Sequence, residues 1–343
     1  RSLFINKDIM SKALFFIVFC IVFLSSCDKK SELPSTSGKI NTISVIIDDK
    51  LWDGEIGDSI RNKFASPVIG LPQEEPLFNI NQYPVKLLEG FMNNCRNIIV
   101  IKKEDKNQFV IKENEFAKPQ IVYYISGKNS ISILDLIQKN APEIISKIRK
   151  SEIQENQRHI DTLLFDFSKL EKQFKINLKI PKEFKYASKK DKFVWLKKEI
   201  TSGNTSLLIY QLPLSVIETK PNVIDDIIKI RDSIGKLYIH GTSRKTKMIT
   251  EAAYAPYLSY TVLDKRYAYE TKGTWEMEND FMSGPFINYS IVDKPNKRIL
   301  VVEGFCYAPS KEKRDLMFEL EAIIKTIKFV KSSNTISKKE IKK

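Results

Sequence analysis

Four consecutive aliphatic residues, 299–302 (Ile-Leu-Val-Val), most constrain what this chain can fold into. A strand that is apolar on both faces must be covered on both sides, so it predicts a central strand. The surrounding sequence favours further strands, at 258–263, 266–271, 274–277, 286–292 and 298–307. A final helix is expected over 311–327, because its apolar residues recur on one face. Together these patterns predict an antiparallel sheet with helices packed on it.

Strands and helices alternate in the first half of the chain. Strands are expected at 42–47, 97–102 and 120–126, and helices at 56–64, from Pro84, and from a cap at Asn129 or Ser130 to about residue 174. Pro142 lies inside the last of these and is expected to kink or restart it. Farther on, strands at 193–200 and 206–211 precede a helix at 223–234.

The fold class is therefore α+β, and 343 residues at about 150 per domain indicate two domains. Residues 40–175 are expected to form an N-terminal α/β sandwich. Residues 176–330 are expected to form an antiparallel sheet with helices that resembles the α/β/α sandwich of PsbP/Mog1-like proteins. That resemblance concerns the fold alone and carries no function.

The segment before the first domain has the features of an export signal. Ala13 to Leu24 is an apolar run of 12 residues that follows Lys12. A membrane-spanning helix needs about 20 residues, so this run fits the core of a cleaved signal instead. It ends in Leu24-Ser25-Ser26-Cys27, which resembles the lipobox of bacterial lipoproteins. The resemblance implies that Cys27 becomes the lipidated first residue; an ordinary signal peptide with a chance cysteine is the alternative.

This interpretation assigns residues 1–26 to upstream sequence and signal peptide, and 27–39 to a flexible linker. Residues 331–343 are expected to be a disordered, Lys-rich tail. The linker has no strongly acidic stretch, since Asp28 and Glu32 are balanced by two lysines. We therefore expect a periplasm-facing protein of the bacterial cell envelope, with the outer membrane favoured over the inner.

The chain is basic, with a formal net charge of +14, but only 10 of its 56 basic residues are arginine. No basic run is interleaved with aromatic residues at a spacing typical of nucleic-acid recognition. We expect solvated lysines and no nucleic-acid partner. The two cysteines that remain besides the signal and lipobox, Cys95 and Cys306, lie in apolar contexts. Buried free thiols are favoured there, with a disulfide as the alternative.

Three segments together resemble a family of envelope lipoproteins of the Bacteroidota, domain of unknown function 4837. They are 70–78 (GLPQEEPLF), 273–286 (GTWEMENDFMSGPF) and 301–324 (VVEGFCYAPSKEKRDLMFELEAII). Ser283 departs from the glycine expected at that position. The resemblance implies coverage of nearly all of 38–330 and an envelope location. It implies no chemistry.

No sequence motif of a known catalytic or cofactor site is present, and we expect no cofactor and no bound metal. Weaker candidates are His240 with Ser243 as a Ser–His pair, Asp48-Asp49 with Asp53 as a cation site, and Glu74-Glu75 as an acid/base pair. For each, the favoured interpretation is structural: a loop histidine, a polar turn and solvent-exposed carboxylates.

Aromatic residues crowd into 254–289, and most are expected to belong to the core. Those that stay on the surface would suit a face that binds protein or glycan. The candidate binding residues are Trp52, Gln73, Glu74, Tyr257 and Trp275.

The function expected from these features is that of a membrane-anchored, non-catalytic protein that binds or scaffolds other envelope proteins. Two alternatives stay open: an envelope hydrolase with a dispersed carboxylate site, and a lipoprotein that binds a small ligand. A deep apolar pocket would support the last.

The lipobox generates the first prediction. Cys27→Ala removes the thiol that carries the lipid, so we expect the protein to move from the membrane fraction to the soluble fraction. Fractionation followed by a carbonate wash measures this. Carbonate-resistant retention of the variant would contradict lipidation as the anchor.

Overall fold

The computed structural model describes residues 32–89, 91–217, 222–243 and 245–330. Cys27, the expected signal at 1–26 and the expected tail at 331–343 lie outside these ranges. Much of the expected flexible linker is instead seated on the first domain. The backbone of Pro34 accepts a hydrogen bond from Lys118 N (2.8 Å), and Ser37 N donates to Asn94 O (2.9 Å).

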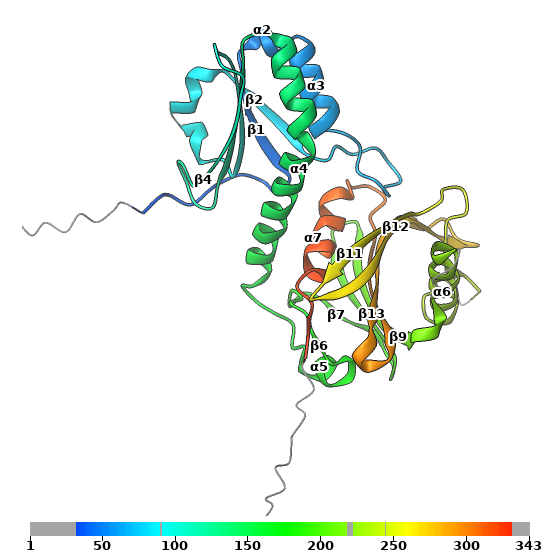
Figure 1. Ribbon diagram of the computed structural model, residues 1–343. Helices are drawn as coiled ribbons and strands as arrows, with labels where there is room; N and C mark the ends of the chain where they lie inside the picture. Colours follow the sequence, from blue (N-terminus) through cyan, green and yellow to red (C-terminus); the bar gives the residue numbers. More distant parts are fainter. Residues whose placement is uncertain (1–31, 90, 218–221, 244, 331–343) are drawn as a thin grey trace, which may run out of the picture.

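The N-terminal domain is built on a five-stranded sheet in the order β2-β1-β3-β5-β4, parallel except for β4. Its elements are β1 (Thr42–Ile46), α2 (Asp49–Trp52), α3 (Glu55–Phe64), β2 (Asn79–Tyr83), η1 (Val85–Glu89), η2 (Phe91–Asn94), β3 (Asn97–Lys103), β4 (Gln108–Glu113), β5 (Ile121–Gly127) and α4 (Ser130–Ile160). The helices α3 and α4 cover one face of the sheet, and the short 3₁₀ turns lie on the other (Figure 1).

Two sequence expectations were wrong in this domain. The helix expected from Pro84 is a pair of 3₁₀ turns, η1 and η2. The restart that was expected at Pro142 does not occur, since α4 is a single helix of 31 residues with Pro142 inside it. The N-cap predicted for this helix is confirmed at Asn129, because Asn129 Oδ1 accepts a hydrogen bond from Ser132 N at 2.9 Å.

The C-terminal domain holds a largely antiparallel sheet in the order β10-β12-β13-β14-β9-β8-β7, with β11 also paired to β12. Its elements are α5 (Ser168–Phe174), β6 (Ile176–Asn177), β7 (Lys185–Lys189), β8 (Phe193–Ile200), β9 (Gly203–Pro213), η3 (Leu214–Val216), α6 (Val223–Tyr238), β10 (Lys247–Thr250), β11 (Tyr257–Leu263), β12 (Arg266–Glu278), β13 (Ser283–Asp293), η4 (Lys294–Asn296), β14 (Arg298–Tyr307), α7 (Arg314–Ile324) and β15 (Lys328–Phe329). The fold class is α+β with two domains, as predicted.

The central strand expected from the aliphatic run is β14, which pairs with β13 on one side and β9 on the other. Leu300 and Val302 face a core closed by α7, α5 and the end of α4, while Ile299 and Val301 face a core closed by α6. Figure 1 shows α7 and α6 on opposite sides of this sheet. The sheet is therefore the middle layer of an α/β/α arrangement.

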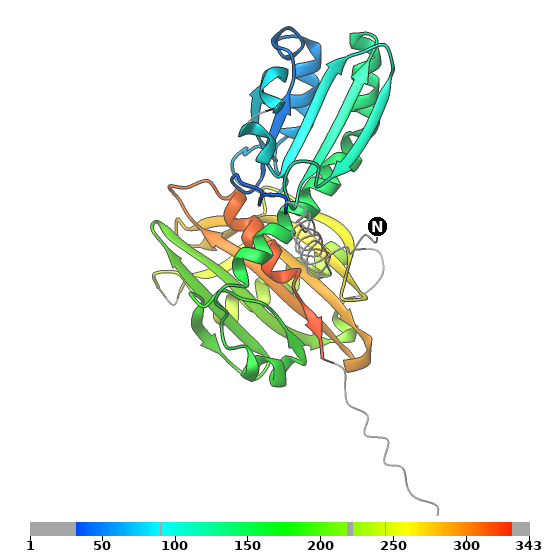
Figure 2. The same ribbon diagram turned by 90° about the vertical axis from the view of Figure 1, so that its left-hand side faces the viewer.

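Helix α4 belongs to both domains. Its first half packs on the N-terminal sheet through residues such as Ile137 and Ile144. Ile153 and Ile160 belong instead to the second core, together with Phe174 of α5. Figure 2 shows the lower half of α4 lying with α7 across the second sheet. The two cores thus meet along α4, upstream of the expected boundary at residue 175.

In the parts of the chain described here, no helix combines the length and the apolar character needed to cross a membrane.

The second prediction concerns Trp275, whose side chain is 1% exposed and packs edge-on to Phe305 in the core under α6. Trp275→Ala should lower the free energy of unfolding by roughly 3–5 kcal/mol, because it leaves a cavity. Trp52→Ala is the matched control. Its ring is only partly buried and lies under the Arg61 guanidinium, so about 1 kcal/mol is expected. Urea unfolding compares the two; equal losses would contradict the prediction.

Candidate functional site

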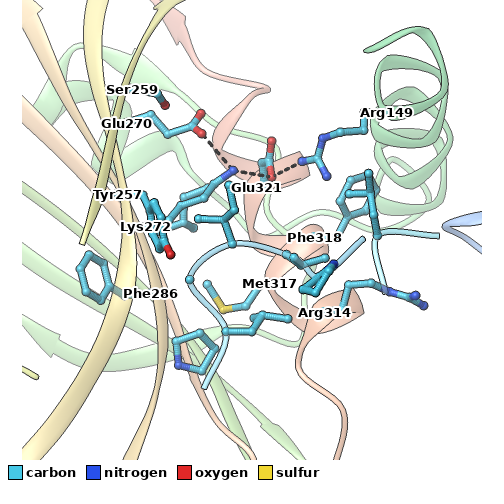
Figure 3. A pocket seen from close by; sticks show the side chains of 18 of the residues that line it. Arg149, Tyr257, Ser259, Glu270, Lys272, Phe286, Arg314, Met317, Phe318 and Glu321 are labelled. Carbon is cyan, nitrogen blue, oxygen red and sulfur yellow. Dashed lines mark hydrogen bonds and ion pairs between the residues drawn. The ribbon is translucent and has the colours of Figure 1, made fainter. Parts of the chain in front are cut away.

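The two domains enclose a pocket of about 430 Å³ between the 66–71 segment, α4, α7 and the strands β11, β12 and β13 (Figure 3). This volume lies in the range of small-molecule sites, which often occur at domain interfaces. The lining is mainly apolar and includes Pro67, Val68, Ile69, Leu71, Leu77, Leu258, Pro285, Phe286, Ile287, Met317 and Phe318.

One wall of the pocket comes from the N-terminal domain, through the segment that follows α3. Gly70 lies here at φ +85°, and a Cβ atom at this position would stand 2.9 Å from Lys272 Cβ. Both the left-handed backbone and the close approach require glycine. The glycine lets this segment lie directly against β12 of the other domain.

The chain continues from this wall to Glu75, and Glu75 attaches the whole 66–78 segment to α7. Its two carboxylate oxygens accept hydrogen bonds from Lys313 N and Arg314 N, each at 2.7 Å. A carboxylate at a helix N-terminus satisfies free N–H groups and opposes the positive end of the helix dipole. The expectation that both Glu74 and Glu75 are solvent-exposed was therefore wrong for Glu75, which is buried.

A chain of ion pairs between β12, α7 and α4 lies at one end of the pocket. Lys272 Nζ lies 2.9 Å from Glu270 Oε1 and 3.7 Å from Glu321 Oε2. Arg149 of α4 donates from Nη2 to the same Glu321 oxygen at 2.8 Å. These side chains come from β12, α7 and α4 and converge at one end of the pocket (Figure 3).

Glu321 is the centre of this chain and is 5% exposed. Burial acts to raise the pKa of its carboxyl group, but the cations Lys272, Arg149 and Lys325 outweigh burial and hold the pKa well below its ordinary value. The carboxylate is thus charged at every physiological pH.

The other arginine at the pocket, Arg314, is held by groups around it. Its guanidinium donates to Pro76 O at 2.8 Å and to Asn79 Oδ1 at 3.1 Å, and it pairs with Asp315 at 2.9 Å. The charges of the pocket are therefore largely neutralised by one another, and the apolar surface remains open to a ligand.

A buried cluster beside the pocket fixes the junction of the domains. Glu152 of α4 is 0% exposed and accepts hydrogen bonds from Arg96 Nε (2.7 Å), Asn97 Nδ2 (2.6 Å) and Asn41 N (2.7 Å). Asn41 Nδ2 in turn donates to Asp315 of α7 at 2.9 Å. A buried charge with this many partners holds one arrangement of its elements, because losing a partner is costly.

The five candidate binding residues do not form one surface. Tyr257 lines the pocket and is exposed. Gln73 and Glu74 are exposed on the 66–78 segment but do not line the pocket. Trp52 is partly buried against the N-terminal core, and Trp275 is a core residue.

The weaker chemical candidates have structural roles. Asp48 Oδ1 accepts a hydrogen bond from Lys50 N at 3.0 Å and begins α2, and Asp49 accepts one from Gln82. Ser243 Oγ accepts from Lys245 N, and His240 Nδ1 contacts Thr246 O. Cys95 and Cys306 are free thiols. Among the residues with described positions, no three His, Cys, Asp or Glu side chains form a metal-binding group.

Sequence reasoning missed Glu321 and Lys272, which carry the charge of the pocket. One signal for Glu321 was available. It lies between Met317 and Ile324 on the apolar stripe of α7, where a carboxylate needs a buried partner. The partners themselves are on β12 and α4, 49 and 172 residues away, respectively.

Comparison with known families divides the chain at the end of α4. Residues 164–326 match a domain of unknown function (DUF4837), and residues 36–161 match a second domain of unknown function (DUF8532). The expected resemblance to domain of unknown function 4837 is thus confirmed for residues 164–326. The expected coverage of nearly all of 38–330 was wrong, because residues 36–161, which include the 70–78 segment, match the second family. A search of curated proteins found no match.

The third prediction concerns the charge at Glu321. Glu321→Gln should lower the free energy of unfolding by about 2 kcal/mol at neutral pH, because Arg149 and Lys272 lose a charged partner. The folded-state pKa lies below the ordinary value of 4.5, so this stabilisation is complete above 4.5 and is lost as the pH falls toward the folded value.

Urea unfolding at neutral and acidic pH measures this difference. The gap between wild type and variant should shrink in acid. Glu319→Gln is the control, since Glu319 pairs with Lys198 away from the pocket. A gap that is the same at both pH values would contradict the ion-pair assignment.

Proposed function

We propose that this protein is a lipid-anchored envelope protein that binds a small, mainly apolar ligand in the pocket between its two domains. The pocket itself carries the proposal. It is apolar, of ligand size, and bounded by elements of both domains that are attached to one another by Glu75 and Arg149.

The state of the charges indicates the ligand class. A site for an anion would present a cation without a partner, whereas Lys272 and Arg149 both contact Glu321. A site for a cation would present an unpaired carboxylate, and Glu270 contacts Lys272. An uncharged ligand therefore loses the least hydration free energy when it enters this pocket. A polar group at one end of such a ligand can contact the ion pairs of Lys272, Glu321 and Arg149.

The location rests on the sequence. If Cys27 carries the lipid, the chain from Cys27 to Pro34, where contact with the N-terminal domain begins, spans at most about 25 Å. The N-terminal domain would then stay near the membrane, within reach of apolar molecules that leave it. From Cys27 on, the formal net charge is +12, because residues 1–26 account for two of the fourteen, and this charge is compatible with an anionic membrane surface.

Exposed aromatic residues on the β11–β12 hairpin favour a second candidate, the binding of other envelope proteins. Tyr260 is 60% exposed and stacks on Tyr267 at 5.7 Å between ring centres, beside the exposed Val262. Tyrosines of this kind are enriched in interfaces. The hydrolase alternative finds less support, because both oxygens of Glu75 are engaged by backbone N–H groups.

The fourth prediction tests the pocket with an uncharged apolar probe, N-phenyl-1-naphthylamine. The full chain should bind it with a saturable increase in fluorescence. Leu71→Asp places a charge in the apolar wall and should weaken binding about tenfold, which corresponds to about 1.4 kcal/mol. Leu237→Asp, on the exposed side of α6, should leave the affinity unchanged.

Circular dichroism and thermal unfolding are the controls that check whether both variants are folded. No saturable binding by the wild type, or equal loss in both variants, would overturn the pocket as a binding site. Recovery of a protein partner by crosslinking in cells, with no probe binding, would favour the second candidate.

A further inference from the structure

A second, smaller pocket lies on the other side of the C-terminal sheet, beside α6. Its volume is about 250 Å³, and it is bounded by β8, β10, β12 and the loop that follows α6. Its lining is rich in sulfur and aromatic rings: Trp195, Lys197, Asn204, Ile239, His240, Gly241, Thr242, Met248, Trp275, Met277, Met282, Phe305 and Tyr307.

Three of the six methionines of the chain lie together here. Met248 of β10 is the register partner of Met277 on β12. Met277 N donates to Met282 O at 2.8 Å across the turn between β12 and β13. Directly paired residues on one face of a sheet have Cβ atoms about 5 Å apart, so the side chains of Met248 and Met277 are neighbours.

One of the two histidines of the chain lies at the same pocket. His240 Nδ1 is 2.7 Å from Thr246 O. A carbonyl oxygen only accepts hydrogen bonds, so Nδ1 carries the proton and Nε2 of the neutral ring keeps its lone pair. The backbone also brings this loop onto the methionines, because Met248 N donates to Ile239 O at 3.1 Å.

Trp275 adds an aromatic ring next to the sulfurs. It lies two residues before Met277 on β12, and so on the same face of the sheet. Its Nε1 is buried and has no hydrogen-bond partner within the described part of the chain. The ring face of tryptophan is the strongest aromatic site for a cation.

We propose that this pocket binds one soft monovalent metal ion, Cu(I), through the thioethers of Met248, Met277 and Met282 and through Nε2 of His240, with Trp275 beside the ion. Thioether sulfur selects Cu(I), and imidazole also suits copper. Hard cations such as Ca²⁺ require oxygen ligands, and no carboxylate is among the lining residues described here. The inference is independent of the apolar ligand of the interdomain pocket.

The usual role of buried methionine is to fill gaps in a core. Met248 and Met277 do belong to the core under α6, but together with Met282 they also border the open volume of the pocket, and an exposed histidine lies at its edge. The one lysine of the lining, Lys197, has its ammonium group 2.8 Å from Glu199, which compensates its charge. A cation in the pocket is therefore lined by methionine and aromatic side chains and by no uncompensated positive charge.

The fifth prediction is measured on the purified full chain with Cu(I) buffered by bicinchoninate under ascorbate. Accessible thiols are first blocked with N-ethylmaleimide. Cys306 is 0% exposed and belongs to the core on the opposite face of the sheet, so its thiol does not line this pocket. The wild type should withdraw one equivalent of Cu(I) and show quenched tryptophan fluorescence.

Met277→Leu, Met282→Leu and His240→Gln should each weaken Cu(I) binding by about tenfold or more, since even changes outside the ligands of metal sites have effects of that size. Leucine is close to methionine in volume, so the fold should be retained, and thermal unfolding checks this. His159→Gln, on the exposed side of α4, is the matched control and should bind like the wild type.

Failure of the wild type to withdraw Cu(I) would overturn the proposal. So would equal affinity in all variants, or Zn²⁺ binding as tight as that of Cu(I). None of these outcomes affects binding of the naphthylamine probe. The Cu(I) site and the apolar ligand site are therefore tested independently of each other.

Discussion

The arrangement of this molecule depends on one helix that belongs to two hydrophobic cores. Helix α4 packs on the N-terminal sheet with its first half and on the C-terminal sheet and α7 with its second half. The buried carboxylate of Glu152 accepts hydrogen bonds from Asn97, the first residue of β3, and from Arg96 just before it. One turn earlier, Arg149 reaches Glu321 of the other domain. The shared helix and the contacts of Arg149, Glu75 and Asn41 between the domains together favour one relative orientation.

The shape of the interdomain pocket follows from that orientation. Glu75 joins the 66–78 segment to the first residues of α7, and Asn41 joins the start of β1 to Asp315. Both contacts connect groups of the two domains through hydrogen bonds to charged partners, which are the stronger kind. A pocket whose walls are held in this way is organised before a ligand arrives, which reduces the entropy lost on binding.

The two faces of the C-terminal sheet offer two different chemical environments. The face toward α7 and α4 borders an apolar pocket whose charges are paired with one another. The face toward α6 borders a pocket of thioethers, indole and imidazole. The alternation of side chains along β12 separates them, since Lys272 and Glu270 point one way and Trp275 and Met277 the other. One strand thus serves both proposed sites.

Local patterns determined much of the secondary structure. The aliphatic run at 299–302 predicted the central strand β14, and the period of apolar residues predicted α3, α6 and α7, because burial of one face or of both faces leaves a direct trace in the sequence. Strand β4 and the 3₁₀ turns after Pro84 were missed, since they are only partly buried and carry weak patterns. Expected strands at 266–271 and 274–277 are one strand, β12, which continues through Gly273 because β13 pairs with it without a break from Ala268 to Glu276.

The sequence by itself also indicated an export signal, from the apolar run before Cys27, and showed which residue types are available for chemistry. Only the tertiary structure decided which of them meet. Glu75 looked like one of two exposed carboxylates until α7, more than 200 residues later, supplied the N–H groups that bury it. Glu321, Lys272 and Arg149 come from three elements, and the methionines and the histidine of the second pocket come from two strands, a turn and a loop. Contacts between residues that are far apart in the sequence depend on how the sheets and helices pack. The period of apolar residues along the chain predicts which face of an element is buried, but it does not predict which other element covers that face.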